Sequence, residues 1–127
     1  MALVTTKEMF KRAYEGHYGI GAFNIDNIDV LRAIMRAANN LKAPIIIMVS
    51  GGAWRFMNPL YIRRACDAAA EEFPDVEFAL HLDHGKSVEL CKQAVDAGFT
   101  SVMIDASSLP YEENIKATQE VVAYAHA

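Results

Sequence analysis

Cysteine is scarce in this sequence, which has only Cys66 and Cys91 among its 127 residues. They form no CxxC pair, so the sequence predicts neither a zinc ribbon nor a disulfide framework. Long apolar runs are also missing: the longest strongly apolar run, residues 45–49, is far shorter than the roughly 20 residues that cross a bilayer. Residues 1–12 lack the apolar core of a signal peptide. We therefore expect a cytoplasmic protein that makes no membrane contact.

Runs of basic residues are absent as well. The chain carries 12 Lys and Arg against 16 Asp and Glu, with a net charge of -4, which argues against nucleic acid as a partner. An anionic substrate would need a local cation. What is abundant is apolar sequence: 53% of the residues are hydrophobic and 22% are charged, so we expect a globular chain. No linker or low-complexity tract divides it, and residues 1–127 are read as a single domain.

The hydrophobic pattern alternates between two periods. Short apolar runs at 18–24, 45–49, 76–82 and 101–104 predict strands, and each is followed by a segment with apolar positions three and four apart, which predicts a helix. A first helix precedes the strands, and Thr5 with Glu8 has the spacing of a capping box. The last helix begins near Pro110 and is expected to bury Ile115 and Val122.

The number of these units indicates the fold. Four βα units of about 30 residues each fit the first half of an eight-stranded (β/α)8 TIM barrel of roughly 250 residues, preceded by a helix. A doubly wound sheet with a dinucleotide loop is less favoured, because Gly19 and Gly21 lack the third glycine of that fingerprint. A four-stranded half would expose two strand edges and an apolar inner face. The chain is therefore interpreted as an incomplete α/β barrel.

In such barrels the reacting groups lie at the carboxyl ends of the strands. This rule selects four places: Asn24, the segment Ser50-Gly51-Gly52-Ala53, the segment His81-Leu82-Asp83-His84-Gly85, and the segment Asp105-Ala106-Ser107. The segment 81–85 offers imidazole metal ligands beside a proton-transfer carboxylate. Alternation along the strand points the side chains of residues 81 and 83 to one face, and residue 84 sits where the strand breaks.

Several of these residues also have structural interpretations. His81 could be a hydrogen-bonded core histidine. Ser50 with its following glycines could present a hydroxyl and N–H groups to a phosphate, or simply make a turn. Arg55 and Lys86 could be phosphate partners or surface charges. Asp105 could be a carboxylate behind a metal ligand or a loop cap.

The motifs together resemble a known family. They are Gly21-Ala22-Phe23-Asn24, Ser50-x-Gly52-Ala53 followed by Arg55-Phe56, the segment 81–85, the segment 98–105 with the sequence GFTSVMID, and Glu113-Asn114-Ile115. In this order and spacing they are similar to the class II, metal-dependent fructose-bisphosphate aldolases and to their close relatives, the tagatose-bisphosphate aldolases. The resemblance covers essentially the whole chain. Phe56 and Ala106 depart from the tyrosine and the glycine that are frequent at these positions.

This resemblance implies roles for individual residues. His84 would be one of three histidine ligands of a catalytic Zn²⁺, and Asp83 would be the acid/base that exchanges a proton with the C4 oxygen of the sugar. Asn24 and Ser50 would bind substrate, Ser50 near its phosphate. Asp105 would lie beside the metal pocket, at the position of a second metal. A second metal or a monovalent cation is left open.

The implied activity is the reversible, zinc-dependent cleavage of fructose 1,6-bisphosphate to dihydroxyacetone phosphate and glyceraldehyde 3-phosphate, a step of glycolysis and gluconeogenesis. The alternatives are tagatose-bisphosphate cleavage, or a non-catalytic half barrel that assembles with a partner half. The family's other two zinc histidines, its carbon-proton base and its phosphate loop belong to its second half. We therefore expect this chain alone to be inactive, and the whole enzyme to be a homo-oligomer, a dimer or a tetramer, acting on a phosphorylated sugar.

Overall fold

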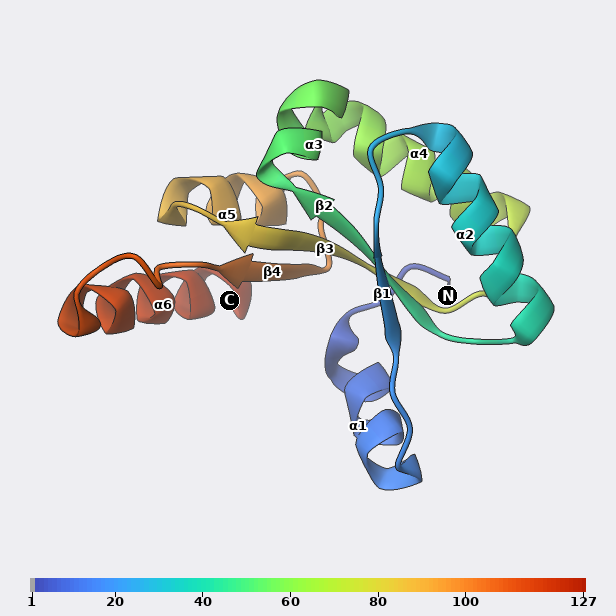
Figure 1. Ribbon diagram of the computed structural model, residues 1–127, viewed down its shortest axis with the longest axis horizontal. Coiled ribbons are helices and arrows are strands. Elements are labelled where there is room, and N and C mark those ends of the chain that lie inside the picture. Colours follow the sequence, from blue (N-terminus) through green and yellow to red (C-terminus); the bar gives the residue numbers. More distant parts are fainter. Residues whose placement is uncertain (1) are drawn as a thin grey trace.

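The computed structural model describes residues 2–127 and contains one parallel sheet with the strand order β1-β2-β3-β4. Helices alternate with the strands along the chain, as Figure 1 shows. The elements are α1 (Thr6–Gly16), β1 (Gly21–Asn24), α2 (Ile28–Leu41), β2 (Ile45–Ser50), α3 (Gly51–Met57), α4 (Pro59–Glu72), β3 (Phe78–Gly85), α5 (Val88–Asp96), β4 (Ser101–Ile104) and α6 (Tyr111–Ala125). This parallel α/β arrangement confirms the fold class that the hydrophobic pattern predicts.

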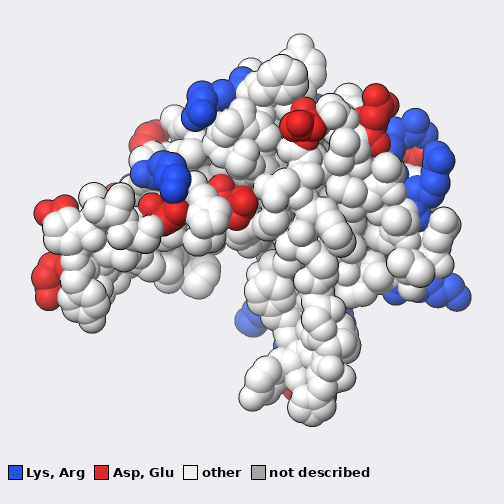
Figure 2. Space-filling model, viewed as in Figure 1, with Lys and Arg blue, Asp and Glu red and all other residues white. Residues whose placement is uncertain are grey.

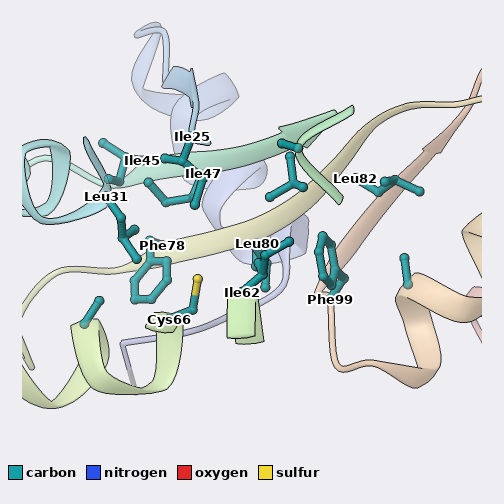
Figure 3. Packing of buried hydrophobic residues seen from close by; sticks show 14 of the residues in the cluster. Ile25, Leu31, Ile45, Ile47, Ile62, Cys66, Phe78, Leu80, Leu82 and Phe99 are labelled. Atoms are coloured by element: carbon teal, nitrogen blue, oxygen red, sulfur yellow. The ribbon is translucent and has the colours of Figure 1, made fainter. Parts of the chain in front are cut away.

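The main core lies between one face of the sheet and the helices that cover it. Phe78, Leu80 and Leu82 alternate along β3 and are fully buried on this face. They pack in one cluster with Ile62 and Cys66 of α4, as Figure 3 shows. Strands buried in this way are apolar at nearly every position, which explains the unbroken run along β2. The cluster fixes the sheet against its helices and so holds the strand ends in place.

The helix α1 lies against the opposite, inner face of the sheet (Figure 1). Its Met9 is buried against Ile46 and Ala79, near the amino ends of β2 and β3. The segment before α1 is held by β3, since the Phe78 N–H donates to the Ala2 carbonyl over 2.8 Å and the Val4 N–H donates to the Phe78 carbonyl over 2.8 Å. The amino end of the inner face is thus covered, while its carboxyl end stays accessible.

The helix starts agree only in part with the sequence pattern. Asn27 and Ser87 cap α2 and α5 through side-chain oxygens that accept from the Val30 and Leu90 N–H groups. The expected capping box is wrong: within residues 2–127, the Thr5 side chain makes no capping hydrogen bond. The backbone pairing of residues 2–4 with β3 sets the entry into α1 instead.

Two strand boundaries differ from the expected ones. β1 begins at Gly21 rather than at residue 18, because its ladder starts opposite Ile45 and the preceding Pro44 has no N–H to extend it. β3 runs from Phe78 to Gly85, so the segment 81–85 belongs to the strand itself. Its last residue is held by the residue that follows β4, since the Asp105 N–H donates to the Gly85 carbonyl over 2.7 Å.

Two local expectations are also corrected. Gly51 and Gly52 do not form a turn but begin the short helix α3, which Ser50 caps by accepting from the Ala53 N–H. In α6 the buried side chain is Val121, whereas Ile115 and Val122 are exposed. The main contacts of α6 are with α5 and β4, so the helix turns its buried side toward these two neighbours.

Both edge strands of the sheet carry exposed apolar side chains. Phe23 on β1 is 45% exposed and Met103 on β4 is 38% exposed. Figure 2 shows that the surface over β1 and α1 is largely uncharged on that face. These features match the open edges expected of half a barrel. No helix within residues 2–127 is long and apolar enough to cross a membrane.

Candidate active site

Polar side chains gather at the carboxyl ends of all four strands. Asn24 ends β1 and Ser50 ends β2. Asp83 and His84 are among the last three residues of β3, and Asp105 directly follows β4. Because parallel strands end at the same edge of a sheet, these five residues share one end of the molecule. The structure thus brings together every site residue that the sequence predicts.

Asp83 is positioned from both neighbouring sides. It lies in register with Ser50 on β2, and its Oδ2 accepts a hydrogen bond from the Asn24 Nδ2 over 3.3 Å. Asn24 and Ser50 also line a cleft with Asp26, Gly52 and Phe56. The two residues that flank the carboxylate therefore line a space that could receive a substrate, and Asn24 holds one of its oxygens.

A β-bulge sets the direction of His84. Leu82 pairs with Val102 and Gly85 pairs with Ile104. Between these two pairs β3 therefore contains one residue more than β4. His84 adopts a left-handed backbone conformation with φ of 51°, which is uncommon for a residue other than glycine. Gly85 permits this arrangement, because a Cβ at this position would lie 2.8 Å from the Met103 carbonyl oxygen and 2.6 Å from the Cys91 Sγ.

The His84 imidazole contacts two carboxylates. Its Nδ1 lies 2.7 Å from the Asp105 Oδ2, and its Nε2 lies 3.8 Å from the Asp83 Oδ1. An ionised carboxylate can only accept a hydrogen bond, so the short contact makes Nδ1 the donor. In a neutral ring Nε2 then carries a lone pair that is directed to the side of Asp83.

Asp105 is surrounded by donors. Its Oδ2 also accepts from the Lys86 Nζ over 2.8 Å, and its Oδ1 accepts from the Ser107 N–H over 3.2 Å and from the Ser107 Oγ over 2.6 Å. The hydrogen bonds from Lys86, Ser107 and His84 hold the pKa of this carboxyl far below its usual range. The side chain of Asp105 is only 9% exposed, so the carboxylate is a fixed and ionised part of the site.

His81 makes a different kind of contact. It is half-buried on the inner face, and its Nδ1 lies 2.7 Å from the Ser101 Oγ. Burial lowers the pKa of this imidazole, and the Asp83 charge partly opposes that change. These features favour the interpretation of His81 as a hydrogen-bonded structural histidine.

Two residues of the site make contacts with Asp105 that the sequence analysis does not specify. The sequence places Ser107 at the mouth without a role, although Asp-x-Ser is the pattern of a turn in which a side-chain oxygen accepts from the backbone two residues later. Lys86 was considered as a phosphate partner or a surface charge, and the structure pairs it with Asp105. That pairing depends on the β3 to β4 contact and has no signal in the sequence alone.

These residues fit one part of a zinc site. A histidine with one nitrogen bound to a carboxylate and the other directed outward is the usual arrangement of a metal-ligating imidazole. Two acceptors 3.8 Å apart, Nε2 and the Asp83 Oδ1, are also stabilised by a cation between or beside them. A catalytic zinc takes three protein ligands, however, and residues 2–127 contain no group of three or more His, Cys, Asp or Glu placed to hold a metal.

Comparison with known proteins adds an independent observation. The family described as fructose-bisphosphate aldolase class II matches residues 4–127. A fructose-bisphosphate aldolase of Giardia intestinalis is 46% identical over 127 residues, which are 100% of this chain and 39% of that protein. The corresponding protein of Geobacillus stearothermophilus is 48% identical over 129 residues, and the match covers 100% of this chain and 45% of that protein.

Solved structures agree with the sequence comparison. The YdjI aldolase from Escherichia coli K12 superimposes with a TM-score of 0.89 at 31% identity, over 98% of this chain and 48% of that one. A fructose-bisphosphate aldolase from Campylobacter jejuni shares the fold, with a TM-score of 0.71 at 22% identity over 98% of this chain and 45% of that one. The chain thus spans less than half the length of these proteins. It belongs to the class II fructose-bisphosphate aldolase family and corresponds to the N-terminal half of its members.

Proposed function

We propose that this chain is the N-terminal half of the barrel of a class II aldolase that reversibly cleaves fructose 1,6-bisphosphate. The observation that carries the proposal is the gathering of Asn24, Ser50, Asp83, His84 and Asp105 at the carboxyl edge of one sheet. Residues 1–127 would form a single structural unit, and the remaining strands of the barrel would close it. The substrate would be a phosphorylated ketose.

Asp83 is suited to move the proton in this reaction. In the cleavage direction its carboxylate would take the proton of the C4 hydroxyl while the bond between C3 and C4 breaks, and in the reverse direction it would return that proton. The hydrogen bond from Asn24 engages Oδ2 and leaves Oδ1 available. Ser50 stands opposite Asp83 in the sheet and lines the cleft, where its hydroxyl would orient the substrate.

His84 is the residue of this chain that would hold the zinc, through Nε2. When bound, Zn²⁺ supplies Lewis-acid polarisation of the substrate carbonyl. The 3.8 Å between Nε2 and the Asp83 Oδ1 places the ligand and the proton acceptor side by side. Both groups would therefore act on neighbouring atoms of the same substrate. The other protein ligands would come from the second half of the barrel.

A chimeric enzyme tests this function. Residues 1–127 would replace the matching 129 residues of the Geobacillus stearothermophilus aldolase, with which they share 48% identity. The purified chimera should cleave fructose 1,6-bisphosphate in a coupled assay, and a chelator should abolish the activity. The unaltered Geobacillus protein serves as the positive control.

The same chimera separates the alternatives. Tagatose 1,6-bisphosphate is assayed in parallel, and a clear preference for that sugar would reassign the substrate while retaining the reaction. A chimera that folds and binds zinc but cleaves neither sugar would contradict the proposal and would favour a non-catalytic half barrel. The variants Asp83→Ala and His84→Ala show that any activity depends on residues of this chain.

A further inference from the structure

The hydrogen bonds around Asp105 point to a role in orienting the neighbouring His84 side chain. Four donor groups surround its two oxygens: the His84 Nδ1 and the Lys86 Nζ at Oδ2, and the N–H and Oγ of Ser107 at Oδ1. A carboxylate has about four acceptor positions, so these contacts saturate it. A metal could bind Asp105 only after one of these donors had moved away.

We propose that Asp105 is a positioning residue for His84, which fixes the ring with its proton on Nδ1 and leaves Nε2 as the only nitrogen available to a metal. This inference deepens the proposed function, since it rests on His84 being a ligand there. Lys86 and Ser107 complete the arrangement by occupying the remaining acceptor positions of the carboxylate. Asp105 acts through His84.

The local backbone makes this orientation necessary. His84 sits at the bulge of β3 with a left-handed φ of 51°, and its side chain is 57% exposed. An exposed imidazole without a fixed partner rotates and exchanges its proton between the two nitrogens. The 2.7 Å contact with Asp105 joins the end of β3 to the residue that follows β4, so the pairing of these strands also determines the direction of the ring.

The test reads the position of the proton directly and needs no metal. The ¹⁵N-labelled chain is studied by long-range ¹H–¹⁵N correlation spectra of the histidine rings, at a pH at which each ring carries one proton. In the unmodified chain His84 should be found predominantly with Nδ1 protonated. In Asp105→Ala the share of this tautomer should fall to that of His17 and His126, whose exposed rings are internal references in the same spectrum.

A matched variant separates the carboxylate from its charge partner. Lys86→Met removes the cation but leaves Oδ2 as an acceptor, so His84 should keep its Nδ1 proton. Nε2-protonated His84 in the unmodified chain would overturn the proposal, as would an unchanged tautomer in Asp105→Ala. If Asp105→Ala does not fold, the tautomer of His84 in the unmodified chain still tests the proposal.

Failure of this inference is distinguishable from failure of the proposed function. The tautomer is measured without zinc or substrate, so an inactive chimera leaves the result intact. Conversely, an active chimera in which His84 carries its proton on Nε2 before metal is added would overturn only the role of Asp105. In the chimera, Asp105→Ala should weaken zinc binding about 10- to 100-fold, the usual cost of losing such a partner. Unchanged zinc affinity would overturn the inference.

Discussion

The glycine at the end of β3 offers the sharpest test of how the site is built. An ideal Cβ placed on Gly85 would lie 2.6 Å from the Cys91 Sγ, 2.8 Å from the Met103 carbonyl oxygen and 3.0 Å from the Leu82 Cδ2. The Cys91 and Leu82 side chains are fully buried, and the Met103 atom belongs to the backbone. A shift of any of the three atoms would therefore cost free energy. We therefore expect Gly85→Ala to force β3 and β4 apart at the bulge.

The size of the effect follows from two opposing contributions. Overpacking of this kind costs about 1–3 kcal/mol, and three contacts of 3.0 Å or less place Gly85 in the upper part of that range. Replacing glycine with alanine also lowers the conformational entropy of the unfolded chain, which raises the free energy of unfolding by roughly 0.4–1 kcal/mol. The expected net loss in the free energy of unfolding is about 1.5–2 kcal/mol.

Urea unfolding measures this loss. With a slope of about 1.5 kcal/mol/M, the midpoint should fall by roughly 1 M. Gly52→Ala is the matched control, because the nearest atom to its added Cβ is the Ser50 Oγ at 3.7 Å and the residue lies in α3. This control should be equally or more stable than the unmodified chain. The variants are compared at one protein concentration, since any association would shift the midpoint. An unchanged midpoint for Gly85→Ala would refute the packing argument.

Three further predictions concern the chemistry of the site. The 127-residue chain alone should show no aldolase activity with added zinc, and turnover of fructose 1,6-bisphosphate that a chelator abolishes would contradict this. In the chimera, Asp83→Ala should lower kcat by roughly 10²–10⁴-fold and retain zinc, whereas His84→Ala should lose zinc as well; metal analysis of both proteins would reveal a reversed assignment. Burial lowers the pKa of His81 in the folded chain, so the unfolded chain binds more protons and the free energy of unfolding should fall as the pH drops below about 6.5. In His81→Gln this fall should be shallower, and an equal slope in both proteins would contradict the assignment.

The sequence pattern predicts the elements well because their signals are local. The run at 101–104 coincides with β4, and the caps at Asn27 and Ser87 form as expected. The common location of the candidate site residues was also predictable, because a barrel places the ends of its strands at one mouth. The motif at 81–85 marks the most important of these ends.

Apart from the start of α3 at Gly51, the differences arise where distant segments meet. The bulge at His84 requires β4 to pair on both sides of it, and the entry into α1 is set by a bridge between Leu3 and Phe78. The buried side of α6 depends on its contacts with α5 and β4. Each is a tertiary contact that overrides the local preference, and no window of neighbouring residues contains the information.

The bridge between Leu3 and Phe78 has a consequence for the order of events during synthesis. Each strand pairs with the next one along the chain, so the sheet can grow from its amino end as the polypeptide leaves the ribosome. The segment before α1 is the exception, because its partner is made about 75 residues later, a delay of roughly 4–15 s at 5–20 residues per second. Until then Met9 of α1 cannot settle against Ala79. The first helix to be synthesised can therefore dock only after β3 has been made, and a nascent chain stalled before residue 78 should leave it open to a protease.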